Sequence, residues 1–218
     1  MKFIDLSHTI EDGMITYKGL PAPIICDYLS REKSREFYED GTEFHIGKLE
    51  MIANTGTYID CPFHRYPEGK DLSDSELDKF AELDGVLIKN DHRENGLEIG
   101  PECFSNRNLE GKAVLVNTSW DKKWRTDSYF ENHPYLTEEA AKFLVEQKVK
   151  LVGIDSYNID NTKSKRRPVH SVLLKNDIFI VEHLTTLDKL PNNGFHFFAV
   201  PPKIKGMGTF PVRAYAKI

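Results

Sequence analysis

Residues 54–64 read NTGTYIDCPFH and combine polar side chains that can bind a metal with residues that break regular structure. Gly56 and Pro62 interrupt any long helix here, so the polar groups should converge from a loop or a single turn. Residues 48–53 alternate apolar and polar side chains over most of their length, which predicts a half-buried strand. The segment is therefore expected at a strand end, where loops on rigid strands often carry function.

Four side chains in this segment differ in how well they bind a cation. Asp60 and His64 bind divalent metals directly. The Asn54 amide is a weak neutral donor, and the Tyr58 phenol is protonated at neutral pH unless a metal displaces its proton. The segment predicts a site and leaves its activity undecided.

The rest of the chain predicts a large mixed sheet with few helices. Thr137 is a plausible N-cap, and the acidic first turn and apolar stripe that follow indicate a helix ending near Lys148. It leads directly into an apolar run, so it should pack on the sheet. A shorter helix is expected over residues 73–80. The predicted strands are short, rich in β-branched or aromatic residues and bounded by turn residues: 85–89, 112–117, 150–154, 177–181 and 195–200.

Length and composition favour one globular domain, residues 1–218. The chain is 39% hydrophobic and 29% charged, without a linker-like segment or an internal repeat. No apolar run approaches the roughly 20 residues that cross a bilayer, and residues 1–5 turn acidic too early for a secretory signal. We expect a cytoplasmic protein that does not bind membranes.

The charge pattern argues for small-molecule chemistry. A net charge of −5 lacks the clustered basic residues with which proteins bind nucleic acid. The one dense basic run, residues 163–167, has two interpretations: a solvated turn, which is favoured, or a patch that attracts an anionic substrate or product.

A second pair of strong metal donors, His170 and Glu182, lies far along the chain from the first. Two carboxylates and two imidazoles would suit zinc or manganese. Taken one at a time, His170 is more readily a surface or hydrogen-bonded core histidine, and Glu182 a solvated strand residue. Spacing alone does not decide between these interpretations.

The segment 54–64 resembles the signature His-x-Gly-Thr-His-x-Asp-x-Pro-x-His of the cyclase family of metal-dependent hydrolases, which includes bacterial kynurenine formamidase and isatin hydrolase. Asn54 and Tyr58 stand where the signature places its first two histidines. The other five specified positions match: Gly56, Thr57, Asp60, Pro62 and His64. Further similarity lies at 5–8, 17–19, 116–120, 153–155, Asp160, His170, Glu182, 201–204, Gly206 and 211–214.

This resemblance implies a fold, an assembly and an activity. The fold is α/β, swivelling β/β/α-like, with a barrel-like mixed sheet, and the assembly is a homodimer or a higher homo-oligomer. The activity is metal-dependent hydrolysis of a small-molecule amide, formamide, lactam or lactone. A catalytically inactive relative that binds a small molecule is the alternative.

Carried over residue by residue, the resemblance places Asp60, His64, His170 and Glu182 at metal positions, with His64 also able to transfer a proton. Because two histidines are replaced, we expect at most one tightly bound metal, with zinc the first choice and manganese the alternative. If all four residues bound the ion, no position would stay open for a substrate.

The two replaced positions each have two interpretations. Tyr58 either donates a hydrogen bond to a developing oxyanion or, as is slightly favoured, fills the space of a lost metal. Asn54 either contacts a substrate carbonyl or satisfies backbone groups in the turn.

Overall fold

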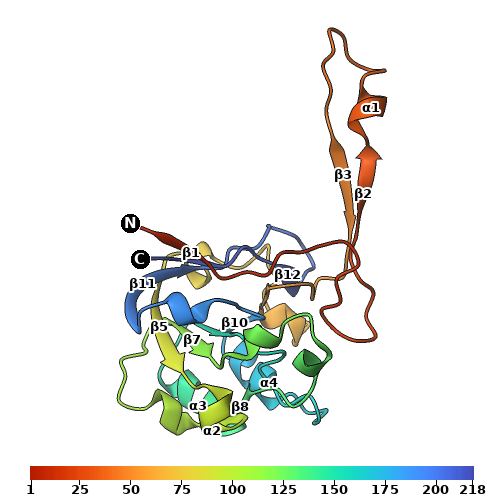
Figure 1. Ribbon diagram of the computed structural model, residues 1–218. Coiled ribbons are helices and arrows are strands. Elements are labelled where there is room, and N and C mark those ends of the chain that lie inside the picture. Colours follow the sequence, from red (N-terminus) through yellow and green to blue (C-terminus); the bar gives the residue numbers. More distant parts are fainter.

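A nine-stranded sheet dominates the computed structural model, which describes residues 1–218 (Figure 1). Its strand order is β1-β13-β11-β5-β7-β9-β10-β4-β12. The strands are β1 (Phe3–Asp5), β4 (Tyr58–Asp60), β5 (Leu83–Lys89), β7 (Ala113–Asn117), β9 (Leu151–Ile154), β10 (Phe179–Glu182), β11 (Asn193–Phe198), β12 (Thr209–Pro211) and β13 (Tyr215–Lys217).

The sheet is parallel in the middle and antiparallel at both ends. β5, β7, β9 and β10 run parallel, β4 and β12 extend one end antiparallel, and β11, β13 and β1 extend the other. The parallel strands are apolar almost throughout because both faces of the sheet are covered there.

Helices and short turns connect the strands. α3 (Glu138–Glu146) begins where the sequence predicts, because the Thr137 side chain accepts a hydrogen bond from the backbone of Ala140. The other helices are α1 (Arg31–Ser34), α2 (His92–Asn95) and α4 (Pro168–Lys175). The 3-10 turns are η1 (Pro62–His64), η2 (Leu77–Lys79), η3 (Pro101–Phe104), η4 (Trp120–Lys123), η5 (Asp127–Phe130) and η6 (Leu187–Lys189).

Two hydrophobic cores lie on opposite faces of the sheet. On β7, Val114 and Val116 face a core shared with α3 and α4, whereas Ala113 and Leu115 face a second core shared with β11, β13 and β1. Figure 1 shows α3 and α4 together below the sheet. The sheet curls around the second core, which confirms the predicted α/β, swivelling β/β/α-like fold with its barrel-like mixed sheet. We propose that residues 1–218 form one domain.

An arm, residues 24–50, stands apart from this body (Figure 1). It consists of the hairpin β2 (Ile24–Leu29) and β3 (Ile46–Glu50), with α1 beyond β2. All strand residues of the hairpin except Leu29 are exposed. A further small sheet pairs β6 (Glu98–Ile99) with β8 (Tyr135–Leu136).

The structure confirms most predicted elements and corrects two. Each strand predicted after residue 80 is present, with shifted ends. The half-buried strand expected over 48–53 is wrong, because β3 lies in the arm with every residue exposed. The helix expected over 73–80 is also wrong: only the turn η2 forms there, and the Asp71 carboxylate accepts hydrogen bonds from the backbone of Ser73 and Asp74, which favours a local turn. None of the helices has the length and apolar character needed to span a membrane.

Candidate metal centre

Strand register brings four polar side chains to one face of the sheet. Glu182 lies opposite Tyr58 in the β10–β4 ladder, and Asp60 lies opposite Thr209 in the β4–β12 ladder. Because side chains two residues apart on a strand share a face, Tyr58 and Asp60 point the same way. All four are buried.

His64 reaches this group from the turn that follows β4. Pro62 starts η1, and the backbone of His64 packs so closely on Gly208 that any side chain at position 208 would clash with it. The Thr209 hydroxyl gives its one proton to Asp60 Oδ1, so its oxygen accepts from His64 Nδ1, 2.7 Å away. The Nε2 atom of His64 is left with the lone pair that binds metals.

His170 comes from the other direction, on the first turn of α4. Its ring Nδ1 lies 2.6 Å from Asp160, and the same carboxylate accepts hydrogen bonds from the backbone N–H groups of Val169 and His170. Asp160 therefore holds both the start of the helix and the ring. Nε2 of His170 is directed to Asp60 Oδ2 at 3.6 Å and to Glu182 Oε1 at 3.8 Å.

Asp60, His64 and His170 form a group of potential metal ligands. One donor atom from each lies within 4.8 Å of the other two. Asp60 Oδ2 is buried and has no hydrogen-bond partner. An unpaired buried carboxylate oxygen is costly, and a cation removes that cost. One carboxylate and two imidazoles with lone pairs on Nε2 fit a divalent metal.

Glu182 adjoins this group but is held by protein donors. Its Oε1 accepts a hydrogen bond from the backbone of Ile159 at 2.6 Å. Its Oε2 accepts from the Tyr58 hydroxyl, with the Tyr17 hydroxyl at 3.3 Å and the Asn158 amide at 3.4 Å. Both oxygens of Glu182 thus accept hydrogen bonds, and Glu182 lies beside the group of three potential ligands.

The site is electronegative. Burial raises the pKa of Glu182 to about 7, and the charge of Asp60 adds to this effect. Burial alone would lower the pKa of His170, but the hydrogen bond to Asp160 and the negative charges of Glu182 and Asp60 raise it to about 10. A cation at Nε2 would take the place of this proton, since metal binding requires a neutral imidazole.

The group borders a cavity of about 280 Å³. His64, His170 and Glu182 line it, and so do Tyr58 and Asn54. Burial raises the pKa of Tyr58 well above 10, so its phenol stays protonated and can donate its proton to Glu182. The structure thus brings together all of the side chains that the sequence singled out, with Asn54 at the cavity wall.

Several site residues were not predicted in these roles. Asp160 orients His170, Thr209 orients His64, and Tyr17 and Asn158 contact Glu182. The helix α4 was also missed, although Pro168 at its first position and the apolar spacing after it are helix signals. For Thr209, no local signal exists, because only strand pairing places it beside Asp60.

Comparison with known proteins shows which family the sequence matches. A sequence profile of the family described as "Putative cyclase" matches residues 4–161. Kynurenine formamidase of Bacillus cereus is 30% identical over 214 residues, covering 98% of this chain and 96% of that protein. Kynurenine formamidase of Bacillus anthracis is 28% identical over 214 residues, with the same coverage.

Solved structures share the fold. Isatin hydrolase A from Labrenzia aggregata superimposes with a TM-score of 0.84 at 23% identity, covering 99% of this chain and 93% of that one. An isatin hydrolase bound to the product analogue thioisatinate gives a TM-score of 0.83 at 20% identity, covering 100% and 92%. The fold and the relatives define a hydrolytic class of enzyme. This chain belongs to the cyclase family, as its sequence predicts.

Proposed function

We propose that this protein is a metal-dependent hydrolase of a small-molecule amide, formamide, lactam or lactone. The observation that carries the proposal is the convergence of Asp60 with His64 and His170, two histidines that line a cavity, and a buried Asp60 oxygen that no protein group satisfies. The relatives named kynurenine formamidase support hydrolysis of an amide-type bond.

In this proposal, each protein group has a physical role. Asp60, His64 and His170 hold a divalent ion, which when bound supplies Lewis acidity that activates water and polarises a carbonyl. Asp160 fixes the ring of His170 and makes it a better ligand. His64 is the least buried of the three, at 36% exposure of its side chain, so it is the one placed to pass a proton to a leaving group when its ring does not bind the ion.

Tyr58 and Glu182 form the wall beside the ion. The Tyr58 proton is directed to Glu182, and its ring is buried, so we favour a space-filling and positioning role over donation to an oxyanion. Glu182 adds negative charge at 3.8 Å from His170 and strengthens cation binding. Asn54, at the cavity wall, is proposed to hydrogen-bond a substrate carbonyl.

We propose one tightly bound ion, with zinc preferred over manganese. Two imidazoles and one carboxylate match catalytic zinc sites, whereas manganese prefers more oxygen ligands. Restoring both histidines of the family signature, in Asn54→His/Tyr58→His, tests the stoichiometry. Elemental analysis should rise from one ion per chain toward two; two ions in the unaltered chain would contradict the proposal.

Metal content and turnover test the function together. The purified protein should hold one divalent ion and hydrolyse a member of a formamide, lactam and lactone panel, and Asp60→Asn should lose both properties. Asp74→Asn, which changes an exposed carboxylate outside the metal group, is the matched control. Stoichiometric metal without turnover of any panel member would favour the alternative, an inactive relative that binds a small molecule.

We also propose a homodimer in which a second copy of the chain covers the arm. The arm carries eight of the fifteen exposed large hydrophobic residues: Ile24, Ile25, Tyr28, Phe37, Tyr38, Phe44, Ile46 and Leu49. At roughly 100 Å² each, they offer on the order of 800 Å² per chain, about what one partner buries in a stable interface. A lone two-stranded hairpin is marginal in water, so this surface needs cover.

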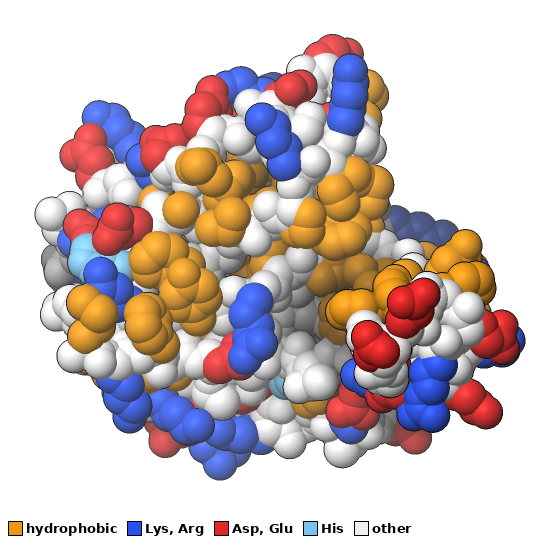
Figure 2. Space-filling view, turned by 90° about the horizontal axis from the view of Figure 1, so that it is seen from above, with side chains coloured by type: hydrophobic (Ala, Val, Ile, Leu, Met, Phe, Trp, Pro, Cys, Tyr) orange, Lys and Arg blue, Asp and Glu red, His pale blue; other side chains and the backbone are white.

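The face from which the arm rises offers a complementary surface. Figure 2 shows groups of hydrophobic side chains on this face of the body. Phe3 of β1 and Tyr215 of β13 line a hollow, and Phe3 is 61% exposed. A two-fold arrangement would let each arm cover the other body, because the two-fold axis repeats every contact between an arm and the body of its partner.

Light scattering on a sizing column tests the dimer. Ile25 and Leu49 are paired across the hairpin and both exposed. The unaltered chain should elute at twice its mass of 25.1 kDa, and Ile25→Glu/Leu49→Glu at the single mass. Leu77→Glu, which changes an exposed leucine of the body, should remain dimeric. A monomeric unaltered chain would rule the dimer out.

A further inference from the structure

Two arginines border the cavity of the candidate metal centre. Arg65 directly follows His64, and Arg167 directly precedes α4, three residues before His170. Both arginines and both histidines line the same cavity. The elements that carry the potential metal ligands therefore also carry two positive charges.

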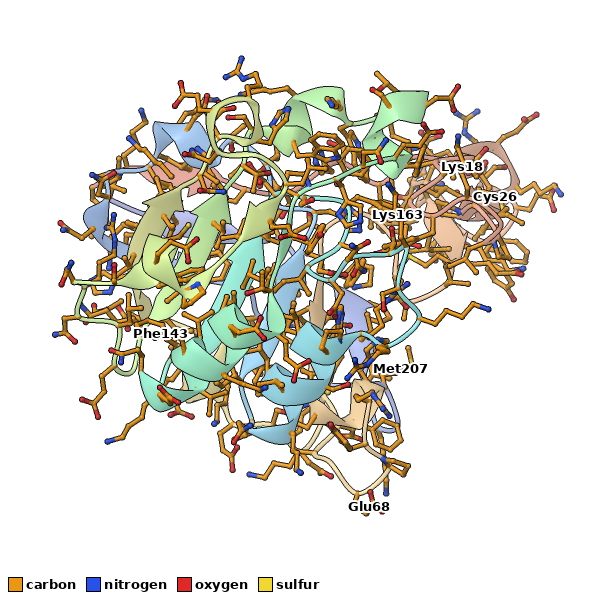
Figure 3. All side chains as sticks on the ribbon, turned by 90° about the horizontal axis from the view of Figure 1, so that it is seen from below. Lys18, Cys26, Glu68, Phe143, Lys163 and Met207 are labelled. Carbon is orange, nitrogen blue, oxygen red and sulfur yellow. The ribbon has the colours of Figure 1, made fainter.

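The local backbone holds Arg167 at this position. Its conformation is left-handed, with φ of 51°, and its Nη1 donates to the carbonyls of Asn161 and Ser164. These contacts fold the guanidinium back over the loop that precedes α4. Figure 3 shows Lys163 of this loop on the same side of the molecule as Lys18, in the segment before the arm.

Neither cavity arginine is neutralised by a carboxylate. Arg65 donates from Nε to the Ser171 hydroxyl at 3.3 Å and lies 5.3 Å from the centre of the Tyr66 ring, and Arg167 meets only carbonyls. No carboxylate lies within 4.0 Å of either guanidinium. Of the seven other arginines, four pair with acidic side chains: Arg35, Arg93, Arg125 and Arg213.

This uncompensated charge stands out because the chain as a whole has a net charge of −5. Overall electrostatics do not favour an anionic ligand, so attraction at this site is local. Guanidinium groups bind carboxylates with paired, charge-assisted hydrogen bonds. The carbonyls that contact Arg167 accept only from its Nη1, so its other N–H groups remain available to a carboxylate. Tyr17 and Leu20 also line the cavity and provide apolar surface there.

We propose that Arg65 and Arg167 determine specificity for a substrate that bears a carboxylate. The reacting carbonyl lies at Asp60, His64 and His170, and the carboxylate is bound by the two arginines. This inference rests on the proposed hydrolase function. The cavity of about 280 Å³ limits the substrate to a small molecule, such as an acylated amino acid or an acylated aminobenzoate.

A matched pair of substrates tests the role of the charge. 2-Formamidobenzoate and 2-formamidobenzamide have the same scissile formamide and nearly the same shape, but only the first is anionic. Each of Arg65→Gln and Arg167→Gln should lower kcat/KM for the benzoate about tenfold and for the benzamide less than about twofold. Arg65→Lys, which keeps the charge, should recover part of the loss.

Arg166→Gln is the control, because it removes the same charge one residue away from Arg167 and Arg166 does not line the cavity. It should leave the ratio of the two kcat/KM values unchanged. Equal losses on both substrates in the Arg65 and Arg167 variants, or an equal loss in the Arg166 variant, would overturn the proposal.

A binding measurement separates this inference from the hydrolase proposal. Calorimetry on the protein as purified should show tighter binding of benzoate than of benzamide, and Arg65→Gln/Arg167→Gln should reduce that preference at least about tenfold. If no panel member is hydrolysed but this result is obtained, the hydrolase proposal fails and the anion site stands. If the preference is absent or survives the double substitution, the anion site fails.

Discussion

β3 and β4 lie only eight residues apart in the sequence, yet they have opposite environments. Every residue of β3 is exposed in the arm, and every residue of β4 is buried in the sheet. β4 has neighbours on both sides, β10 and β12, whereas β3 has only β2. The number of strand neighbours, rather than local sequence, decides which segment can hold buried polar groups.

That difference explains where the candidate chemistry lies. Asp60 is fully buried and keeps an unpaired oxygen, which only a rigid and well-packed surrounding can enforce. A hairpin with two exposed faces has no comparable support. The arm is suited to association with another surface, and the body is suited to holding a cation.

Removing a ligand from the body should have the largest effect. His170→Ala should release the metal and lower activity more than about a hundredfold, because even loss of an orienting partner costs 10–100-fold. Metal analysis and steady-state kinetics measure this. Lys175→Ala, at the far end of the same helix, is the control; activity retained in His170→Ala would exclude the ligand role.

The next effect concerns packing in the body. Leu144 on α3 is fully buried, so Leu144→Ala should lower the free energy of unfolding by about 3 kcal/mol through lost contacts and a cavity. For a chain of this length, that is a fall in Tm of about 10 °C. Thermal unfolding followed by circular dichroism tests it. A fall of less than about 2 °C would mean that α3 is not firmly packed on the sheet.

Acid should destabilise the body through His133, a buried histidine whose pKa is lowered. Burial lowers the pKa of His133 to about 4, so the neutral ring stabilises the fold above the unfolded pKa of about 6.5, and this stability is lost as the pH falls toward 4. Between pH 7 and pH 5, His133 should lower the free energy of unfolding by about 2 kcal/mol. Urea unfolding at both pH values should show a smaller pH effect in His133→Asn than in the unaltered chain. His45→Asn, an exposed change in the arm, should not reduce it.

Substitution in the arm should have the smallest effect on the single chain. Tyr28 is 76% exposed, so Tyr28→Ala should change the free energy of unfolding by less than about 0.5 kcal/mol when measured under dilute, monomeric conditions. Urea unfolding provides the value. A loss as large as that of Leu144→Ala would show that the arm packs on its own body, and the contrast between the two regions would disappear.

The sequence predicted the elements whose signals are local. The Thr137 cap and the acidic turn after it place α3 correctly, and the apolar runs place the central strands. The exposed position of β3 was missed, because alternation of apolar and polar residues does not reveal whether the apolar face meets the same chain. The helix expected over 73–80 failed because Asp71 stabilises a competing turn.

The sequence by itself determined the family, through the spacing within residues 54–64 and the similarity beyond them, and it named Asp60, His64, His170 and Glu182. Only the tertiary structure decided how these residues are used. Strand register places Thr209 beside Asp60, and the Asp160 carboxylate aims His170 at the same point. Such contacts join residues far apart in the chain, and their geometry depends on strand pairing and packing that no local pattern encodes.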